Sequence, residues 1–362
     1  MSKSIVNSWN EWGKLKEIIV GTIDKSCIPD AEPMYDLKTC KKNLSGKDFS
    51  VESKQNANIQ LDYFVDILKK NDVIVHRPST DESKENTEIL TPYFKSRYNY
   101  LSCPRDVFSI LGNTILEAPM SMRCRYFDHQ QYTPFMNELF KTNINSRWIS
   151  CPKSTMSDDL YVTDYPFDVK KRMELILNNN YGLKDNHPIF DASDIYRCGT
   201  VLFVQIGFTT NKLGFQWIKR TFPEFEVKPV YFENNTSPVP ISYLINIPRP
   251  GHLIYCPNRP PNNNTLGFFK KRNWNLIPAP PPSKMSADPY NNYSPLLYMN
   301  ILSLNEKLVI VEQDEKKLIQ TLNNIGIDCI PIPFRDVYKF GGSFHSHTLD
   351  IYRESSFEDF FS

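Results

Sequence analysis

The second half of the chain alternates between short apolar runs and segments with helical spacing. Residues 199–208 form a continuous apolar, β-branched run, which is typical of a buried strand, and residues 211–222 repeat apolar positions with the period of a helix. A further apolar run at 225–232 completes a strand–helix–strand unit. The same order recurs through 251–280 and 306–334, about every 50 residues, which is typical of a repeat architecture.

Weaker copies of this unit occupy the first half of the chain. Apolar runs at 16–21 and 72–78 flank a helical pattern at 58–71, and similar signals follow at 106–119 and 125–140. Because every unit contains a helix, the pattern disfavours an all-β propeller. It predicts an α/β fold in which ββαβ-type units close into one ring, so that loops from several units meet at one pocket.

Two proline-rich segments, 237–243 and 277–285, are typical of loops between units. No stretch is long enough to act as a linker between domains. We therefore expect residues 1–362 to form a single domain, with its core between about residues 5 and 353.

The charge and the cysteines limit the function classes. The 42 basic and 41 acidic residues leave a net charge of +1, with no basic stripe for a nucleic acid. No run approaches the roughly 18 apolar residues of a membrane helix, and the first residues do not form a secretory leader, which predicts a cytoplasmic protein. The eight cysteines include no C-x-x-C pair, so we expect no metal site, no disulfide framework and no cofactor.

Six motifs follow one another along about residues 5–353. They are "VNSWNEWGKLKEIIVG", "CPRDVFSILGNTILEAPMSMRCRYF", "FDASDIYRCG", "TTNKLGFQWIKR", "CPNRP" and "FGGSFHSHTLD". Together, and in this order, they resemble the glycine/arginine amidinotransferase family. The resemblance implies the pentein fold of that family, with five ββαβ modules around a pseudo-fivefold axis. The enzymes of the family transfer an amidino group from arginine to an amine through a covalent cysteine intermediate, and several act in natural-product pathways.

The resemblance breaks at the residues that carry this chemistry. A thiolate must attack the guanidinium carbon and a histidine must carry the proton to the departing amine. In the family the nucleophile lies in an F-H-C-W-T-C-D motif, and its second Cys aligns with Leu349; the family histidine aligns with Pro240, and the aspartate after it with Ser242. Loss of a nucleophile typically lowers turnover by a factor on the order of 10⁶. We therefore expect no Cys-dependent amidino transfer.

Other positions match the family. The resemblance implies that Asp191 is the triad aspartate and that Asp106 contacts the donor guanidinium. It also implies that Arg259 pairs with a substrate carboxylate, to which a guanidinium is suited, and that Ser294 contacts substrate. His345 matches the histidine of the F-H pair.

New ionisable residues lie beside the lost nucleophile. If residues 344–350 are extended, their side chains alternate, and His345, His347 and Leu349 share the face that points into the pocket. His347 would then act as a general base, or the two histidines would only fill volume; a metal site at this pair is the less favoured alternative. Cys256 and Cys198 are candidates for a displaced thiol, although buried structural cysteines are the commoner case.

Three hypotheses follow from these residues. The first is a repurposed group-transfer enzyme, for example one that moves an acyl group from an activated donor to an amine or hydroxyl, with His347 or His345 as base and Asp191 as its orienter. The second is a pseudoenzyme that binds an amino-acid-like ligand or a partner subunit, and the third is residual amidino transfer. The expected partner is a small molecule, amino-acid-like or a carrier-bound acyl donor, and a homodimer is compatible with the sequence.

The pocket hypothesis can be tested by where six polar residues lie in the fold. A protein whose pocket no longer has a function would not be expected to keep so many buried polar side chains. Each buried polar group without a partner lowers the stability of the fold by about 1–3 kcal/mol. We predict that they line one cavity and that Arg259 is not consumed by an internal carboxylate. The six are Asp106, Asp191, Arg259, Ser294, His345 and His347.

Overall fold

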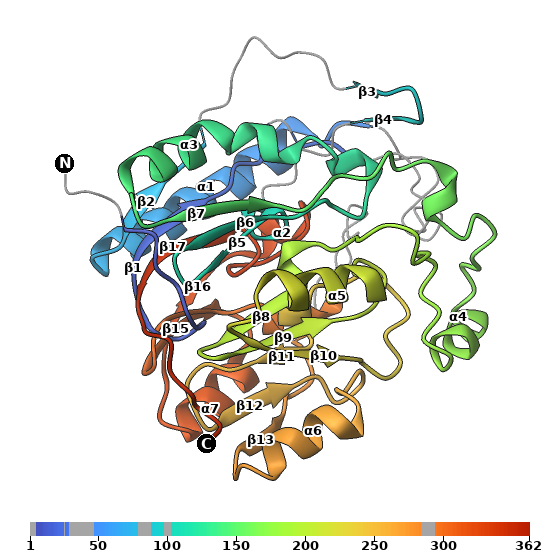
Figure 1. Cartoon of the computed structure of the whole chain (residues 1–362). Helices are drawn as coiled ribbons and strands as arrows, with labels where there is room; N and C mark the ends of the chain where they lie inside the picture. Colours follow the sequence, from blue (N-terminus) through green and yellow to red (C-terminus); the bar gives the residue numbers. More distant parts are fainter. Residues whose placement is uncertain (1–4, 25, 29–46, 79–87, 98–102, 284–293) are drawn as a thin grey trace.

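The computed structural model describes residues 5–24, 26–28, 47–78, 88–97, 103–283 and 294–362. Within these residues, five three-stranded sheets form the body of the molecule, and a two-stranded hairpin stands beside them (Figure 1). In each three-stranded sheet the middle strand is antiparallel to one neighbour and parallel to the other. The hairpin pairs β3 (Glu88–Leu90) with β4 (Lys95–Arg97).

Four of the sheets take three strands that follow one another along the chain, and the fifth combines β17 with β1 and β2. The sheets are β5 (Phe108–Leu111), β6 (Thr114–Glu117) and β7 (Arg147–Ser150); β8 (Ile195–Cys198), β9 (Val201–Gln205) and β10 (Glu226–Val230); β11 (Ile245–Asn246), β12 (His252–Tyr255) and β13 (Asn275–Pro278); β14 (Leu302–Asn305), β15 (Leu308–Glu312) and β16 (Asp328–Ile332); and β17 (Thr348–Glu354), β1 (Lys14–Val20) and β2 (Ile74–His76).

One helix joins the middle and the third strand of every sheet, as a parallel pair of strands requires. In Figure 1, α3 lies above the strands and α6 and α7 lie below them. The arrangement confirms the predicted ββαβ units and the pentein fold. The joining helices are α3 (Thr133–Thr142), α5 (Lys212–Thr221), α6 (Asn263–Lys270), α7 (Lys316–Asn324) and α1 (Val51–Lys70).

Shorter elements lie between the modules and, for η1 and η2, between β6 and β7 of one module. They are the helices α2 (Pro104–Val107), α4 (Val169–Ile176) and α8 (Arg335–Tyr338) and the 3₁₀ turns η1 (Arg123–Arg125), η2 (Asp128–Gln131), η3 (Asp158–Leu160), η4 (Ala192–Asp194), η5 (Ile241–Tyr243) and η6 (Pro295–Met299). No helix in the described part of the chain is long and apolar enough to cross a membrane. The expectation of a single domain stays a prediction.

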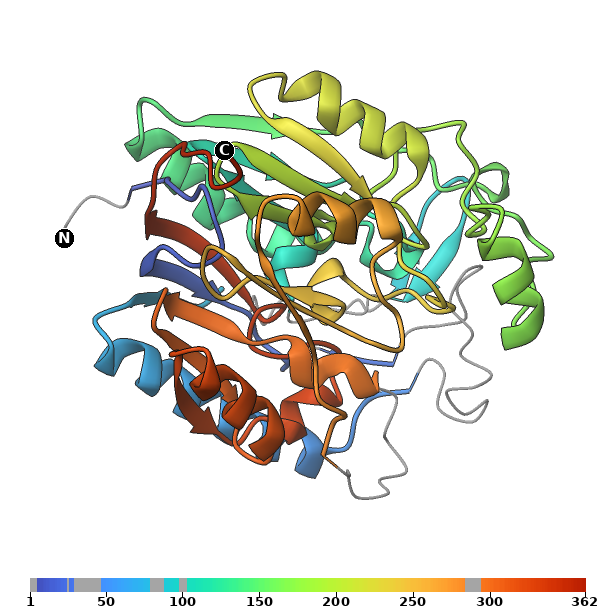
Figure 2. The same cartoon turned by 90° about the horizontal axis from the view of Figure 1, so that it is seen from below.

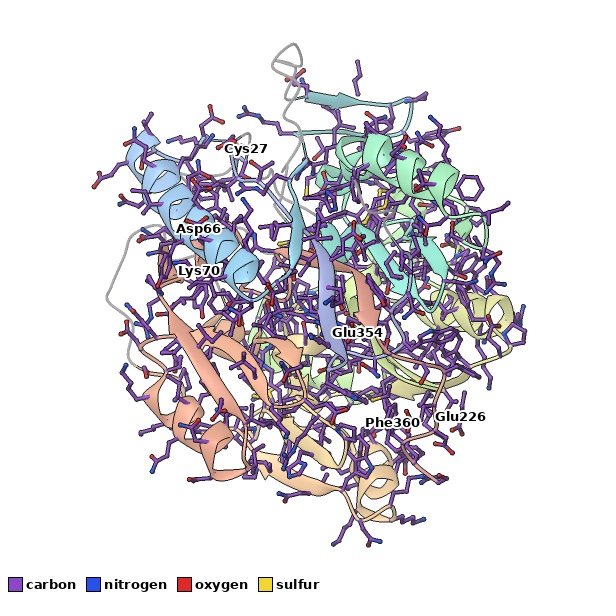
Figure 3. The ribbon with its side chains drawn as sticks, turned by 90° about the vertical axis from the view of Figure 1, so that its left-hand side faces the viewer. Cys27, Asp66, Lys70, Glu226, Glu354 and Phe360 are labelled. Carbon is purple, nitrogen blue, oxygen red and sulfur yellow. The ribbon has the colours of Figure 1, made fainter. Side chains whose placement is uncertain are left out.

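The two ends of the chain close the ring by sharing one sheet. β17 pairs antiparallel with β1, with Leu349 opposite Ile19 and Thr348 opposite Val20 (Figure 2). The first strand of the N-terminal module therefore comes from the C-terminal end of the chain. After Glu354 the chain runs on to Phe360, whose ring packs on that of Trp12 with the centroids 5.0 Å apart (Figure 3).

Helix starts follow from local sequence. The side chain of Asn211 accepts a hydrogen bond from the Gly214 N–H at 2.7 Å and caps α5, and Asn262 caps α6 through the Thr265 N–H at 3.0 Å. The apolar faces of the helices pack against the sheets in two large clusters of buried side chains. The segments predicted from their periodicity as strands and helices between residues 199 and 334 are therefore confirmed.

The prediction that residues 344–350 are extended throughout is wrong for the first half of this segment. Residues 344–347 form a helical turn, in which the His347 N–H donates to the Ser343 carbonyl at 3.0 Å, and β17 begins only at Thr348. The side-chain oxygen of Asn300 holds the turn, because it accepts from the backbone N–H groups of Ser343 and Ser346, both at 3.0 Å. Strand alternation therefore does not govern where the two histidines point.

A network of buried charges ties the modules together behind this turn. Glu11 accepts two hydrogen bonds from Arg197 of β8, both at 2.7 Å, and Arg197 also donates to Asp350 of β17 at 2.6 Å. Arg105 and Arg353 donate to Asp350 as well, Arg353 at 2.7 Å. The side chains of the five are at most 5% exposed. Two carboxylates and three guanidinium groups thus link the N-terminal segment, α2, β8 and β17.

We predict that this network controls stability. Glu11→Gln should lower the free energy of unfolding at pH 7 by about 3–5 kcal/mol, because it leaves buried guanidinium groups without their carboxylate. The arginines hold the pKa of Glu11 well below its usual range, against the effect of burial. A depressed carboxylate pKa stabilises the protein above the unfolded pKa, and this contribution is lost as pH falls through the folded pKa.

Urea unfolding of wild type and variant at pH 7 and pH 3 tests this prediction. The gap between the two proteins should be smaller at pH 3. Glu354→Gln is the control, because Glu354 pairs with Lys16 at 3.8 Å on the surface and its loss should cost less than about 1 kcal/mol. Equal effects of the two substitutions would contradict the prediction.

Candidate active site

One pocket forms where the five modules begin. In every module the first strand is preceded by a short turn or helix that reaches the same place. These segments are Cys103–Val107 before β5, 191–194 before β8, 238–243 before β11, 294–299 before β14 and 341–347 before β17. Because the repeat brings the same end of every module to one place, residues far apart in the sequence meet there.

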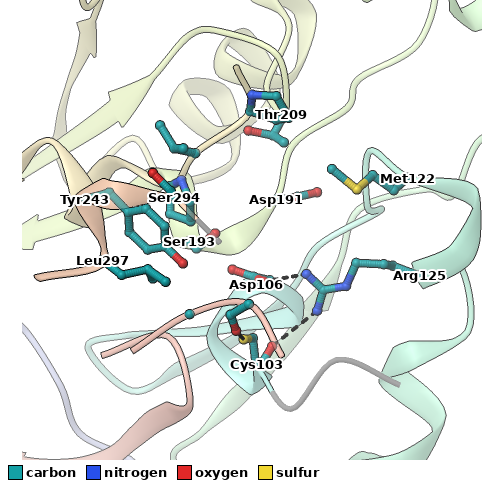
Figure 4. Close-up of a pocket in the computed structure, with 15 residues that line it drawn as sticks. Cys103, Asp106, Met122, Arg125, Asp191, Ser193, Thr209, Tyr243, Ser294 and Leu297 are labelled. Atoms are coloured by element: carbon teal, nitrogen blue, oxygen red, sulfur yellow. Dashed lines mark hydrogen bonds and ion pairs between the residues drawn. The ribbon is translucent and has the colours of Figure 1, made fainter. Parts of the chain in front are cut away.

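The pocket encloses about 140 Å³ and has mixed polar and apolar walls (Figure 4). The proline-rich segment 237–243, predicted as a loop between units, supplies much of one wall. The lining residues are Cys103, Asp106, Met122, Arg125, Asp191, Ser193, Thr209, Pro238, Val239, Pro240, Tyr243, Ser294, Leu297, Gly341 and Gly342.

An acidic cluster around one arginine dominates the charge of the pocket. The Arg125 Nη1 donates to Asp106 Oδ2, and Arg125 Nη2 donates to the Cys103 carbonyl at 3.3 Å. Figure 4 shows Asp191 on the same side of the pocket as Arg125 and Asp106. Asp191 Oδ1 accepts from the Ser121 N–H at 2.8 Å, whereas Asp106 Oδ1 has no hydrogen-bond partner in the part of the chain that the structure describes.

Two acidic groups beside the pocket, Asp191 and Asp194, have raised pKa values. Burial raises the pKa of Asp191 to about 7, with Asp106 adding to the rise and Arg125 opposing it. Burial and then Asp191 hold the pKa of Asp194 well above its usual range, although Thr209 and Thr210 donate to Asp194 at 2.6 and 2.7 Å. The cluster therefore has more acidic groups than its single arginine can balance, and it favours a bound cation.

Arg259 and Ser294 lie at or beside the pocket. Ser294 lines it, and Arg259 Nη1 donates to Asn235 Oδ1 and Ser237 Oγ, both at 2.9 Å, one residue from the pocket wall at Pro238. No carboxylate of the described residues pairs with Arg259, and burial lowers its pKa. A half-buried guanidinium with neutral partners remains able to bind an anion, in agreement with the prediction for Arg259.

Comparison with known proteins identifies the family. Glycine amidinotransferase, mitochondrial, from Gallus gallus is 34% identical over 98% of this chain and 85% of its own length, and L-arginine:L-lysine amidinotransferase from Pseudomonas savastanoi pv. phaseolicola is 32% identical over 99% and 97%. The chain belongs to the amidinotransferase family. No family model matches the sequence.

Two solved amidinotransferase structures have the same fold. SxtG from Microseira wollei, an amidinotransferase of saxitoxin biosynthesis, superposes with a TM-score of 0.87 at 29% identity over 98% of this chain and 99% of its own. Inosamine-phosphate amidinotransferase StrB1 from Streptomyces griseus superposes with a TM-score of 0.86 at 26% identity over 99% and 100%. Both cover the whole ring of modules.

The structure changes the expected position of the nucleophile. Leu349 is fully buried in the apolar core, in the same cluster as Ile19 and Val107, so position 349 does not face the pocket. The nearest side chain of this turn is Ser346, because a Cβ on the pocket residue Gly342 would lie 2.8 Å from Ser346 Cβ. Ser346 therefore fits the position of the family nucleophile better than Leu349 does. Neither Ser346 nor Leu349 carries a thiol.

The two histidines are not among the residues that line the pocket. His345 lies in the buried charge network, where its Nε2 contacts Glu11 Oε2 at 3.0 Å, and burial lowers its pKa to about 4. His347 is fully buried, with its ring centroid 5.8 Å from that of Phe334. Of the six residues predicted to line one cavity, Asp106, Asp191 and Ser294 do so, Arg259 lies next to it, and the prediction for His345 and His347 is wrong.

Pro240 and Ser242 are the residues that the motif resemblance aligns with the family histidine and aspartate. Pro240 lines the pocket, and the Ser242 hydroxyl accepts from the Asn300 amide at 2.8 Å. Asn300 is the residue that also holds the turn before β17. Ser242 is therefore bound to the residue that holds the turn before β17. Pro240 has no side-chain group that can carry a proton.

Cys103 is the pocket thiol that the sequence reasoning missed. Its sulfur donates to the Gly341 carbonyl at 3.0 Å, and burial and the neighbouring Asp106 raise its pKa well above the usual range. Cys198 and Cys256 instead lie in the apolar core. Cys103 and Arg125 both belong to the motif that carries the resemblance, "CPRDVFSILGNTILEAPMSMRCRYF", but nothing in the sequence indicates that they meet.

No metal site can be assigned in the described residues, which contain no cluster of three or more suitable ligands. Among the described residues, the pocket lining instead combines the carboxylates of Asp106 and Asp191 with the guanidinium of Arg125 and the thiol of Cys103.

We predict that Gly342 keeps the pocket floor open. A Cβ at this position would lie 2.9 Å from the Cys103 sulfur and 2.8 Å from Ser346 Cβ, and its φ of +100° disfavours other residues. Gly342→Ala should lower the free energy of unfolding by about 2 kcal/mol or more. Gly251→Ala is a matched control, because Gly251 has a φ of +80° and no atom within 4 Å of its Cβ position.

Denaturant unfolding of both variants separates backbone strain from steric conflict. Gly251→Ala should cost about 1 kcal/mol, which is the strain alone. An equal loss in the two variants would show that the space around Gly342 is not restricted.

Proposed function

We propose that this amidinotransferase-family protein binds an amino-acid-like cation, of the guanidino class, in the pocket without performing Cys-dependent amidino transfer. One observation carries the proposal: among the described residues, the pocket combines an excess of carboxylates with no histidine and with no thiol of lowered pKa. The pocket is therefore better suited to binding a cationic ligand than to catalysing amidino transfer.

The acidic cluster supports the cationic half of the ligand. Among the described residues, Asp106 Oδ1 has no hydrogen-bond partner, and Asp191 Oδ1 accepts from the Ser121 N–H. A planar guanidinium can satisfy such oxygens through charge-assisted hydrogen bonds. A bound cation would also favour the ionised form of Asp191, whose pKa burial raises to about 7.

Arg259 and Ser294 support the anionic half of the ligand. Arg259 is a partly buried cation whose partners, Asn235 and Ser237, are neutral. A guanidinium pairs well with a carboxylate in this setting. An α-amino acid with a cationic side chain would place its carboxylate here and its side chain against Asp106 and Asp191. The names of the relatives, which include an L-arginine:L-lysine amidinotransferase, are consistent with this class of ligand.

Group transfer with a histidine base is the alternative function. It would need an activated donor, such as a carrier-bound acyl group, and His347 or His345 within reach of the acceptor. The two histidines lie behind the pocket, and His345 contacts Glu11, so the geometry favours the binding function. The cytoplasmic location and the homodimer stay predictions.

We predict selective and pH-dependent binding. Isothermal titration should detect L-arginine and methylguanidine, while L-citrulline, the neutral analogue of arginine, should bind at least about tenfold more weakly. Because Asp191 ionises near pH 7, affinity for methylguanidine should rise about tenfold between pH 6 and pH 8. Arg259→Ala should weaken L-arginine but not methylguanidine, which has no carboxylate. Equal binding of citrulline and arginine would disprove a cation site.

We also predict that amidino transfer is absent. Incubation with L-arginine and glycine, or with hydroxylamine as acceptor, should release no ornithine above the protein-free background. Cys103→Ala is the informative variant, because Cys103 is the thiol in the pocket. Ornithine formed by wild type and lost in Cys103→Ala would replace our proposal with transfer by a displaced thiol, and turnover lost in His347→Ala would favour the group-transfer alternative.

A further inference from the structure

Arg125 connects the pocket to a carboxylate that lies outside it. Its Nη1 donates to Asp106 in the pocket wall, while its Nε donates to Asp128 Oδ2 at 2.8 Å. Asp128 does not line the pocket and is 2% exposed. The guanidinium of Arg125 is therefore shared between one carboxylate that a ligand can reach and one that it cannot.

Asp128 is poorly compensated by its surroundings. Its second carboxylate oxygen, Oδ1, has no hydrogen-bond partner in the described part of the chain, and neither has the hydroxyl of the fully buried Tyr132. Burial raises the pKa of Asp128 to about 6, against the effect of Arg125 and, more weakly, Lys153. A residue kept only to fill this space would not need a charge that is so incompletely satisfied.

We propose that Asp128 is a positioning residue that acts through Arg125 and thereby sets how strongly the pocket attracts a cation. This inference rests on the proposed cation-binding function. When Asp128 is ionised, it offsets part of the positive charge of Arg125 through the hydrogen bond from Arg125 Nε. The negative charge of Asp106 and Asp191 is then less fully neutralised and remains able to attract a cation. Without that charge, Arg125 would neutralise the two pocket carboxylates more fully.

The charged groups around Asp191 determine the sign of the effect. Three charged or titratable side chains act on Asp191. They are Arg125, which lies in η1, Asp106, which lies in α2, and Asp194, which lies in η4. Beyond these, Cys103 is a neutral thiol, and Lys153 faces Asp128 rather than Asp191. Loss of the negative charge at Asp128 frees Arg125 to favour the ionised form of Asp191, so the ionisation of Asp191 should move to lower pH.

Asp128→Asn tests this inference, because the amide keeps the shape of the side chain and an oxygen that can accept from Arg125. Titration calorimetry with methylguanidine at pH 8 should show about tenfold weaker binding than in wild type. Asp128→Glu should restore most of the affinity. In an Arg125→Met background, Asp128→Asn should change affinity by less than about twofold, because the effect requires the guanidinium.

A second measurement does not depend on any ligand. Carbon-13 NMR of the aspartate carboxyl groups, with the Asp191 signal assigned by its absence in Asp191→Asn, should place its midpoint near pH 7 in wild type. The midpoint should fall by about one pH unit in Asp128→Asn. If wild type does not bind methylguanidine but the midpoint still shifts, the proposed function fails and the role of Asp128 stands.

Other outcomes would overturn the inference. An unchanged Asp191 midpoint and unchanged affinity in Asp128→Asn would exclude an electrostatic role. Failure of both Asp128→Asn and Asp128→Glu to fold at 25 °C would also overturn the inference, because Asp128 would then have a structural role. An equally large effect in the Arg125→Met background would show that Asp128 does not act through Arg125.

Discussion

The buried network of Glu11, Arg197, Asp350, Arg105 and Arg353 is the interaction on which the rest of the structure depends. It joins the segment before β1 to α2, β8 and β17, which belong to different modules. Its members are almost fully removed from water, so none can lose its partner without leaving an unpaired charge in the core. The network therefore specifies how the modules meet, although it does not by itself make them stable.

The pocket is a direct consequence of this arrangement. Each module leads into its first strand through a turn or short helix, and the ring brings these segments to one pocket. Arg105 shows the connection clearly: it donates to the His345 carbonyl at 2.7 Å within the network, while its neighbour Asp106 lines the pocket. A residue of the buried network and a residue of the pocket wall are thus neighbours in the same short helix, α2.

The function we propose joins an absence of amidino transfer to a retained acidic cluster, and the two are compatible in physical terms. Amidino transfer needs a thiolate and a proton carrier at defined positions, whereas the carboxylates of a binding site need only a cation to balance them. In this proposal the scaffold keeps selectivity for guanidino compounds without the reaction, and Arg125 and Asp128 set the charge on which that selectivity depends.

The sequence by itself determined the module order, the family and part of the pocket. The strand–helix–strand pattern is local, because hydrophobic periodicity and caps such as Asn211 are read within a few residues. Asp106 and Asp191 are identified because they lie in motifs that resemble those of the family, and Ser294 because it matches a substrate-contacting serine of the family. Their meeting in one pocket follows from the repeat, which places the start of every module at the same end.

Only the tertiary structure decided the rest. The bonds from Ser343 and Ser346 to Asn300, more than 40 residues away, turn the segment before β17 into a helical turn, and this places His345 on Glu11 and Leu349 in the core. Cys103 and Arg125 are also placed at the pocket by tertiary contacts, because the Cys103 sulfur donates to the Gly341 carbonyl and Arg125 donates to Asp106. Side-chain direction in these positions is set by partners distant in the chain, and a pattern read along one strand carries no information about them.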